Sequence, residues 1–332
     1  MSAAISEEQW EAAAAAIRGA LTPGAQVLLA CHVNPDGDAL GSMLGFAQGL
    51  HQLGVTGLQC SFPGPLTVPE PLQMPGLSYL VPEEEAHEKP DLFLTFDAAS
   101  VTRLGKLAHR LDTATVSVVL DHHASNSGFG RFSLVDPNAA ATSLVAARLL
   151  QRLGVTFDRE IAECLYIALV TDTGSFKFDL TTPEVHELAA RLVATGINVG
   201  GISRRIFDTR SFGAVRLFGE VLGRAELDPA AARGLGMVTA VATIEDLRRH
   251  EQPPYVMEAL IDSIRCTAEA DVACLLKQMG EQEWAVSLRS KGGSDVSKVA
   301  VALGGGGHRL AAGFTGRGAA ADVIREVRER LK

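Results

Sequence analysis

Four short segments of the sequence carry aspartate and histidine residues in a pattern that suits metal binding. Each lies directly after a short apolar run: residues 32–38 (HVNPDGD, with His32, Asp36 and Asp38), Asp97, Asp121-His122-His123, and Asp172. If these runs are parallel strands, their carboxyl ends meet at one edge of a sheet. Five carboxylates and three imidazoles then share a small volume. Because crowded carboxylates repel one another, divalent metal is the simplest counter-charge.

The types of these ligands indicate a particular reaction. Mixed Asp and His ligation suits Mn²⁺ or a similar ion better than Ca²⁺, which prefers an all-oxygen shell. Two such ions ~3.5–4 Å apart acidify a water molecule and stabilise the incoming and leaving oxygens at a phosphate ester. The structural alternative is that each Asp caps a following helix, as Asp38 would for a helix over 39–53. Four coincidences at successive strand ends favour the metal site.

The first two-thirds of the sequence alternates strand-like and helix-like segments. Strands are expected at 27–33, 59–62, 92–96 and 116–120, and helices at 39–53, 142–153, 158–170 and 183–195. Strands separated by helices predict a mainly parallel sheet with flanking helices. Gly41, Gly45 and Gly49 lie four apart and would let the first of these helices approach the sheet closely.

The pattern changes after about Gly196. A helical connector over 204–222 is followed by two short strands at 225–227 and 237–242, a helix at 255–266, and strands at 271–277, 284–289 and 299–303. These segments predict a smaller α+β domain. We therefore expect an α/β catalytic domain over 1–200, a connector over 201–224 and a substrate-binding domain over 225–332, with a cleft between the two domains.

Composition restricts the substrate and the compartment. The net charge is −9, and Lys and Arg form no run beyond short pairs such as Arg204-Arg205 and Arg248-Arg249, whereas a protein that grips long nucleic acid usually carries a basic face, so we expect any polyanionic substrate to be short. Five scattered cysteines argue against a disulfide framework and a thiolate zinc site. The N-terminus lacks a secretory pattern and no apolar run is long enough to span a bilayer. These features predict a cytoplasmic protein.

At the residues described above, the sequence resembles the DHH phosphoesterases, a family named for the motif seen here as Asp121-His122-His123. Further segments resemble other motifs of that family and of its DHHA1 domain: 32–42 (HVNPDGDALGS), 97–100 (DAAS), 171–176 (TDTGSF), 287–290 (SLRS) and 304–308 (GGGGH). The resemblance covers nearly the whole chain. In length and domain pairing it is similar to the NrnA type, oligoribonucleases that also dephosphorylate 3′-phosphoadenosine-5′-phosphate.

The resemblance implies roles for individual residues. One metal ion, usually Mn²⁺ in this family, would be held by His32, Asp36 and Asp97. The second would be held by Asp38, Asp97, His122 and Asp172, so that Asp97 bridges the two ions. The catalytic residues would be Asp97, Asp121 and His123. Asp121 would orient His122 from behind, and His123 would face the scissile phosphate as ligand or proton donor.

Two C-terminal features predict substrate binding. A glycine tract is often only a flexible turn, but without Cβ atoms its backbone N–H groups can approach an anion closely. With the resemblance added, we expect substrate contacts from Gly305, Gly306, Gly307 and His308. Arg289, followed by Ser290, ends an alternating strand; it is either a solvated edge charge or a bidentate phosphate clamp, and we favour the clamp.

The expected activity is hydrolysis of short RNA or DNA oligonucleotides, including dinucleotides, to mononucleotides, together with dephosphorylation of 3′-phosphoadenosine-5′-phosphate. The same chemistry on pyrophosphate, polyphosphate, single-stranded DNA (RecJ-like) or cyclic and linear dinucleotides is the main alternative. A nucleotide-binding module without activity is disfavoured because the metal set is intact. The resemblance allows a homodimer. Arg103, six residues after Asp97, contacts either phosphate or a structural salt-bridge partner, and the sequence leaves this open.

Overall fold

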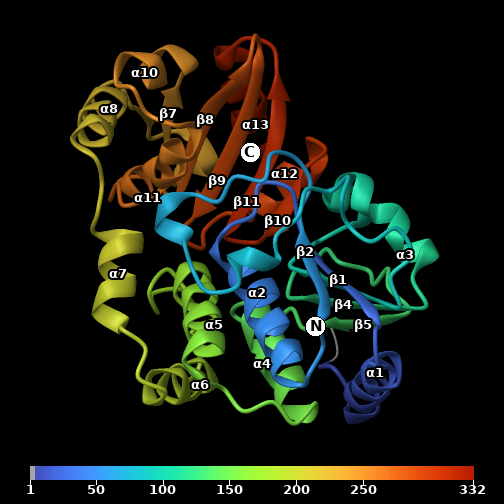
Figure 1. The fold of residues 1–332 in the computed structure, drawn as a ribbon. Helices are drawn as coiled ribbons and strands as arrows, with labels where there is room; N and C mark the ends of the chain where they lie inside the picture. Colours follow the sequence, from blue (N-terminus) through green and yellow to red (C-terminus); the bar gives the residue numbers. More distant parts are fainter. Residues whose placement is uncertain (1–3) are drawn as a thin grey trace. The chain divides into compact units, whose positions relative to one another are not determined.

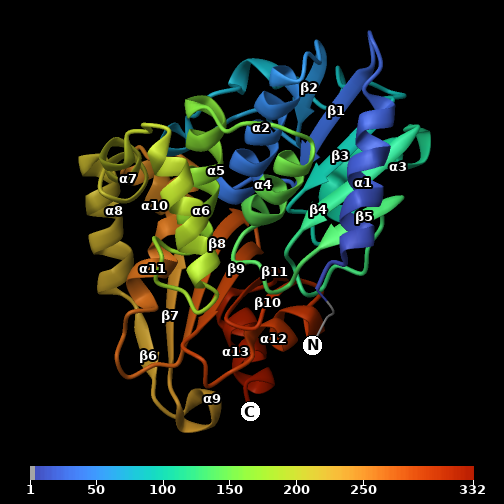
Figure 2. The same ribbon diagram turned by 90° about the horizontal axis from the view of Figure 1, so that it is seen from below.

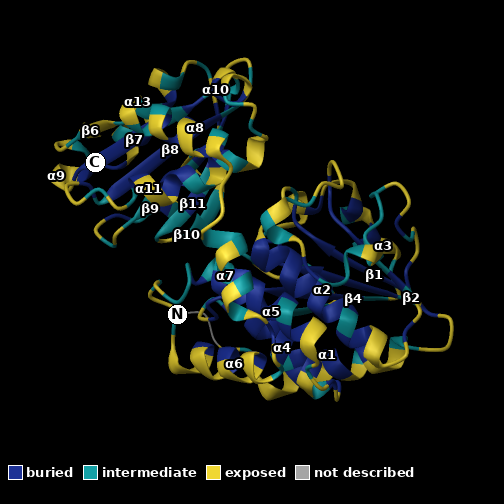
Figure 3. Ribbon diagram, turned by 60° about the vertical axis from the view of Figure 1, so that its left-hand side comes forward, coloured by how far each residue is buried: buried dark blue, intermediate teal, exposed yellow. Residues whose placement is uncertain are grey.

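Residues 4–332 are described by a computed structural model, in which the chain forms two compact units divided between Asp208 and Thr209 (Figure 1). Figure 3 shows that buried residues concentrate on the strands and on the helix faces that pack against them. None of the helices within residues 4–332 is long and apolar enough to cross a membrane.

The first unit is built on a five-stranded sheet. Its strands are β1 (Gln26–Cys31), β2 (Gly57–Ser61), β3 (Leu92–Phe96), β4 (Val116–Asp121) and β5 (Phe132–Val135). The order is β2-β1-β3-β4-β5 and every pairing is parallel. The expected parallel sheet is confirmed. β5 was not predicted, since four residues of mixed polarity give no clear strand pattern.

Both faces of this sheet are covered, which explains why its central strands are continuous apolar runs. Alternate residues of β1, Val27 and Leu29, pack into a core with the helices on one face. These helices are α1 (Glu7–Ala20), α2 (Gly37–Gln52), α4 (Thr142–Arg152), α5 (Arg159–Asp172) and α6 (Pro183–Ala194) (Figure 2). Leu28 and Ala30 face the opposite side, against the 3₁₀ segment η3 (Val101–His109) that precedes α3 (Arg110–Thr113).

The glycines of α2 serve a contact between helices. A Cβ on Gly41 would collide with the carbonyl oxygen of Cys164 in α5, and one on Gly45 would lie 3.2 Å from Leu165. The expectation that this ridge faces the sheet is therefore wrong. The glycines let α2 and α5 approach each other, and both helices contribute to the site described below.

The second unit has a six-stranded sheet in the order β10-β11-β9-β8-β7-β6. Its strands are β6 (Glu226–Asp228), β7 (Met237–Ala242), β8 (Val272–Gly280), β9 (Glu283–Ser290), β10 (Gly306–His308) and β11 (Ala311–Arg317). The β7–β8 pair is parallel and the other pairs are antiparallel. One face packs on α8 (Phe212–Gly223), α10 (Ile244–Arg249) and α11 (Leu260–Ile264), the other on α12 (Val296–Ala302) and α13 (Ala320–Arg330). The smaller α+β domain is confirmed.

Some expected elements differ in the structure. The strand at 299–303 is wrong, because these residues lie largely in α12, whose buried Val296, Val299 and Ala300 have helical spacing. The helix at 255–266 divides into a 3₁₀ segment (Pro254–Ala259) and α11. The connector at 204–222 divides into α7 (Val199–Phe207) and α8, because the Ser211 hydroxyl caps a new helix by accepting from Ala214 N.

Candidate metal centre

Three of the four motif segments follow adjacent strands, and the fourth ends a helix. His32 follows β1, Asp97 follows β3, and Asp121 is the last residue of β4. Asp172 is the last residue of α5, so the helix expected at 158–170 is confirmed and the expectation that Asp172 follows a strand is wrong. The apolar run before it is part of a helix buried on several sides, and periodicity cannot distinguish such a run from a buried strand.

The first cluster contains His32, Asp36 and Asp97. Nε2 of His32 lies 3.4 Å from Oδ2 of Asp97 and 3.9 Å from Oδ2 of Asp36. The other oxygen of Asp36, Oδ1, caps α2 by accepting from Asp38 N and Ala39 N. The capping residue is therefore Asp36, and the alternative that Asp38 caps this helix is wrong.

The second cluster surrounds His122. Its Nε2 lies 3.5 Å from Oδ1 of Asp97, 3.9 Å from Oδ2 of Asp38 and 3.4 Å from Oδ2 of Asp172. Asp97 thus presents one oxygen to each cluster. Asp97 belongs to two groups of possible ligands, one with His32 and Asp36 and the other with Asp38 and His122. Within each group the ligand atoms lie within 4.8 Å of one another. Nitrogen and carboxylate donors at this spacing fit divalent ions.

The pairing of the DHH residues differs from the expectation. Nδ1 of His123 lies 2.7 Å from Oδ1 of Asp121, whereas Nδ1 of His122 lies 3.1 Å from the carbonyl oxygen of Ala139. Asp121 therefore orients His123, and its expected role of orienting His122 stays a prediction. Asn126 Nδ2 donates to Oδ2 of Asp121 at 2.6 Å, which fixes this carboxylate from the other side.

Neighbouring backbone and hydroxyl groups hold the buried carboxylates in place. Asp38 accepts from Thr142 N at 2.6 Å and from Ser143 N at 3.1 Å, at the N-terminus of α4, where the helix dipole favours an anion. The Thr142 hydroxyl donates to Oδ1 of Asp97 at 2.9 Å. Asp97 itself has φ 56°, a left-handed conformation that costs about 1–2 kcal/mol. The sequence analysis did not predict that Thr142 and Ser143 hold these carboxylates. Their position at the start of an expected helix, where backbone N–H groups can bind an anion, was the available signal.

The protonation of the cluster reflects its crowding. Burial raises the pKa of Asp38 well above its usual range, and the charges of Asp97 and Asp172 add to this. Burial acts in the same direction on Asp97, but the hydrogen bond from His32 and the other imidazoles outweigh it and lower the pKa of Asp97.

The imidazoles respond in the opposite sense. Burial alone would lower the pKa of each ring, but neighbouring carboxylates outweigh burial and raise the pKa of His32, His122 and His123. The carboxylates thus favour protonated histidines when no other cation is present. Since a metal ion binds the neutral ring, metal binding must displace such protons.

Comparison with known proteins places this geometry in a family. The DHH family, N-terminal domain, matches residues 26–169, and the DHHA1 domain matches residues 238–332. The bifunctional oligoribonuclease and PAP phosphatase NrnA of Thermus thermophilus is 32% identical over 314 residues, which cover 92% of this chain and 90% of that protein. The chain belongs to the DHH family.

Other comparisons agree with this assignment. The probable bifunctional oligoribonuclease and PAP phosphatase NrnA of Streptococcus mutans is 23% identical, over 92% of this DHH chain and 95% of that protein. The crystal structure of an exopolyphosphatase-related protein from Bacteroides fragilis has a TM-score of 0.85 at 22% identity, over 100% of this chain and 97% of that one, and shows the same fold. DHH proteins are metal-dependent phosphoester hydrolases, so this chain is one as well.

In the DHHA1 domain, Arg289 and Ser290 end β9 and line a cavity of about 350 Å³. Arg265, Cys266, Asp271 and Lys291 complete its lining. The Ser290 hydroxyl accepts from Gly292 N at 3.0 Å, which fixes the turn after the strand. Sequence reasoning missed Arg265 and Lys291, because the folding of α11 against β8 and β9 brings Arg265 to this place.

The glycine tract is partly a strand. Gly306–His308 forms β10, which pairs with β11 so that His308 lies opposite Ala311. A Cβ on Gly305 would collide with the carbonyl oxygen of Gly313, and one on Gly307 would lie 2.6 Å from that of Ala311. Close backbone packing therefore accounts for these two glycines without a ligand. Contact of the tract with substrate stays a prediction.

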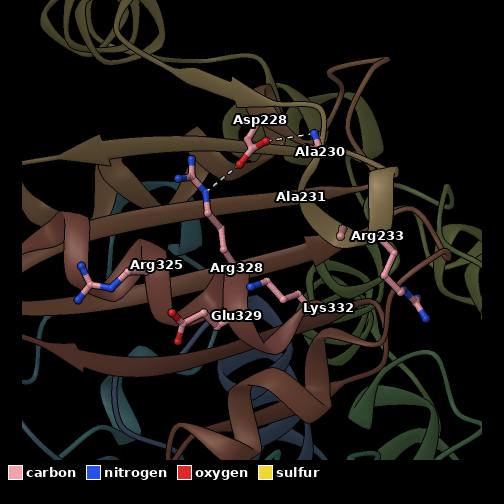
Figure 4. A pocket seen from close by; sticks show the side chains of 9 residues that line it. Asp228, Ala230, Ala231, Arg233, Arg325, Arg328, Glu329 and Lys332 are labelled. Atoms are coloured by element: carbon pink, nitrogen blue, oxygen red, sulfur yellow. Dashed lines mark hydrogen bonds and ion pairs between the residues drawn. The ribbon is translucent and has the colours of Figure 1, made fainter.

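A second cavity, of about 410 Å³, lies between the turn after β6 and α13 (Figure 4). Most of its arginines and its aspartate already have partners, and Arg325 lies 2.7 Å from Asp322. Arg328 lies 3.2 Å from Asp228, and Arg233 donates to the carbonyl oxygen of Gly293 at 3.1 Å. These contacts explain the cluster as surface ion pairing and do not point to a ligand.

Proposed function

We propose that this DHH protein cleaves the phosphodiester bonds of short oligonucleotides to release mononucleotides, and that it also dephosphorylates 3′-phosphoadenosine-5′-phosphate. The observation that carries the proposal is the carboxylate of Asp97, whose two oxygens lie 3.4 and 3.5 Å from two different histidines. The relatives from Thermus thermophilus and Streptococcus mutans are named for these two activities. A net charge of −9 supports short substrates, because long nucleic acid needs a broad basic surface.

The cofactors in this proposal are two Mn²⁺ ions. His32, Asp36 and Asp97 would hold one, and Asp38, Asp97, His122 and Asp172 would hold the other. Bound ions supply an acidified water and neutralise charge on the phosphate. Asp97 would contribute one oxygen to each position. The N–H groups at the start of α4 keep the carboxylate of Asp38 oriented toward its position.

His123 is the proposed proton donor. Its Nδ1 is engaged with Asp121, so a proton delivered to the leaving oxygen would come from Nε2. The Asp121 carboxylate stabilises the protonated ring, and the pKa of His123 is raised despite burial, because the hydrogen bond with Asp121 and the charge of Asp97 outweigh burial. The hydrogen bond with Asp121 therefore favours the protonated form of the ring.

Substrate binding is assigned to the DHHA1 domain in this proposal, through Arg289, Ser290 and the segment Gly305, Gly306, Gly307 and His308. The cavity beside Arg289 is lined by two further cations, Arg265 and Lys291, and one carboxylate, Asp271. This local excess of positive charge in an acidic protein suits the terminal phosphate of a nucleotide. The proposed domains are a catalytic domain over 1–200, a connector over 201–224 and a substrate-binding domain over 225–332.

The location and assembly of the protein complete the proposal. All five cysteines are free and four of them are buried, which suits a reducing compartment such as the cytoplasm. Short DNA as a second substrate and a homodimer are expected from the resemblance alone. Size-exclusion chromatography with light scattering tests the dimer.

A parallel assay with Mn²⁺ tests the function. The purified chain is given a 5′-phosphorylated RNA dinucleotide, 3′-phosphoadenosine-5′-phosphate, a DNA dinucleotide, a cyclic dinucleotide and pyrophosphate, with a chelator control for each. We expect turnover of the first two substrates, abolished by the chelator. Preference for pyrophosphate or the cyclic dinucleotide would replace the proposed substrate class, and no hydrolysis of any substrate would contradict the proposal.

A further inference from the structure

Arg103, in η3, lies against the ring of His32. Its Nη2 is 2.9 Å from Nδ1 of His32. The backbone fixes it there too, because Val33 N donates to the carbonyl oxygen of Arg103 at 3.0 Å and Arg103 N donates to Ser100 O at 3.1 Å. The segment after Asp97 thus returns to the segment that carries His32 and Asp36. The guanidinium of Arg103 therefore lies at the edge of the cluster that contains His32 and Asp36.

Most of the guanidinium remains available. Arginine has five N–H donors in a planar fork, and only the contact of Nη2 with His32 is formed among residues 4–332. Arg103 is exposed, and the described part of the chain forms no ion pair between it and a carboxylate. Arg110 of the neighbouring α3, by contrast, is buried and bonded to Glu88 and four carbonyl oxygens. The structural salt bridge that the sequence left open is therefore not formed.

We propose that Arg103 binds the non-bridging oxygens of the scissile phosphate. Charge balance gives the reason, and this step depends on the proposed two-ion site. The carboxylates of Asp36, Asp38, Asp97 and Asp172 offset two divalent ions, so an incoming phosphodiester anion meets a site without excess positive charge. The guanidinium of Arg103 at the edge of the site supplies this positive charge. The planar fork of a guanidinium also matches two oxygens of a phosphate.

The contact with His32 positions Arg103 for this role. Nδ1 of His32 also lies 2.8 Å from the carbonyl oxygen of Val33, so a ring whose Nε2 holds an ion donates its Nδ1–H to that carbonyl, and the guanidinium packs against the ring. The N–H groups on the other edge of the guanidinium can then donate to a phosphate. The competing explanation is that Arg103 acts only through His32, by holding the ring for metal binding. The two explanations differ in where the effect of a substitution is measured: in substrate affinity and turnover, or in metal affinity.

The test uses Arg103→Ala and Arg103→Lys. The matched control is Lys106→Ala, which removes an exposed cation of the same η3 segment that pairs with Glu84 at 3.1 Å. For each protein, kcat and KM are measured on the RNA dinucleotide at an Mn²⁺ concentration that saturates the parent, and again at a higher concentration. Mn²⁺ affinity is measured by calorimetry without substrate, and thermal unfolding checks the fold.

We expect Arg103→Ala to lower kcat/KM by roughly 10- to 100-fold, the effect of losing a charge-assisted hydrogen bond, with Mn²⁺ affinity unchanged. Arg103→Lys should recover part of the loss, and added guanidinium ion should partly rescue the alanine variant. Lys106→Ala should stay within about twofold of the parent, because its charge is screened at the surface.

Three outcomes would overturn the inference. The first is a kcat/KM for Arg103→Ala within about twofold of the parent. The second is a loss that tracks weaker Mn²⁺ binding and disappears at higher Mn²⁺, which would assign Arg103 to His32 alone. The third is an equal loss of kcat/KM in Lys106→Ala, which would show that any positive charge on this segment has the same effect. Each of these leaves the parent active. A parent that cleaves none of the assay substrates would overturn the proposed function as well.

Discussion

Oδ2 of Asp97 lies 3.4 Å from Nε2 of His32, while the other oxygen of the same carboxylate faces His122. The residue follows β3, the strand between β1 and β4, so it reaches the ends of both neighbours. Its left-handed φ of 56° shows that the backbone leaves the strand sharply at this point. The central strand of the three therefore supplies the ligand that the two clusters share.

Replacing Asp97 with Asn tests this shared role. Asn tolerates the left-handed conformation and keeps the size of the side chain, so the fold should remain. We expect turnover to fall by more than roughly 100-fold and bound Mn²⁺ to fall from two ions per chain, because both positions lose a charged ligand. Elemental analysis after dialysis and a dinucleotide assay measure the two effects. Near-normal turnover with Mn²⁺ present would exclude a bridging Asp97.

The strand ends of this centre were predictable from the sequence, because buried parallel strands are short apolar runs followed by polar ligands. The run before Asp172 was expected both as a strand end and as part of the helix at 158–170, because an apolar run gives the same signal in a helix buried on several sides as in a strand. The partner of Asp121 was also missed, although a signal existed. In extended backbone residues i and i+2 share a side, which favours a contact between Asp121 and His123 over one with His122.

Other parts of the molecule could not be predicted because they depend on tertiary packing. The residues expected as a strand at 299–303 lie largely in α12. The helical spacing of its buried residues is visible only when Val296 is included, three residues before the predicted range. Arg265 reaches the cavity beside Arg289 only through packing between elements. Hydrogen bonds from Thr142 to Asp97 and Asp38 join residues 45 and 104 positions apart, a distance that local patterns cannot span.

Asp121 and His123 should act as one unit. We expect Asp121→Asn and His123→Gln each to lower kcat by roughly 100-fold, the usual contribution of a positioned proton donor. The double variant should be little worse than either single one, because each change already disables the pair. Steady-state kinetics of the three variants measure this. If Asp121→Asn instead releases metal while His123→Gln does not, Asp121 acts on His122 after all.

Metal binding should release protons. Carboxylates raise the pKa of the two proposed histidine ligands, His32 and His122, above the usual 6.5 in the metal-free protein, so an ion that binds the neutral rings must displace protons. Calorimetry of Mn²⁺ binding at pH 7 in two buffers of different ionisation enthalpy should show net proton release. Affinity should increase as pH rises. Proton release of zero at pH 7 would mean that the rings are already neutral.

The same pKa values predict how stability depends on pH. A group with a raised folded pKa stabilises the fold below its unfolded pKa and loses this contribution as pH rises through the folded pKa. The three imidazoles and Asp38 share this sign. The metal-free protein should therefore lose thermal stability as pH rises above about 6.5, while the Mn²⁺-loaded protein should not. Unfolding scans from pH 6 to 9, with chelator or Mn²⁺, make the comparison.

Arg289 should recognise a terminal phosphate. We expect Arg289→Ala to raise KM roughly 10- to 100-fold for a 5′-phosphorylated dinucleotide, with a much smaller change for the same dinucleotide without that phosphate. Arg325→Ala is the control, since Arg325 is an exposed arginine of the same domain paired with Asp322 at 2.7 Å. Equal losses on both dinucleotides would show that Arg289 does not bind the terminal phosphate.

The close approach of α2 and α5 should make Gly41 sensitive to a single methyl group. A Cβ at this position would collide with the carbonyl oxygen of Cys164 and lie 2.9 Å from Cβ of Ala168. Because backbone cannot move aside cheaply, we expect Gly41→Ala to lower the free energy of unfolding by roughly 1–3 kcal/mol. Gly19→Ala in α1 is the control: nothing lies within 4 Å of its Cβ, so helix propensity should stabilise that variant by up to about 1 kcal/mol. Urea unfolding of the metal-free proteins measures both changes, and an unchanged midpoint for Gly41→Ala would show that the two helices can separate without cost.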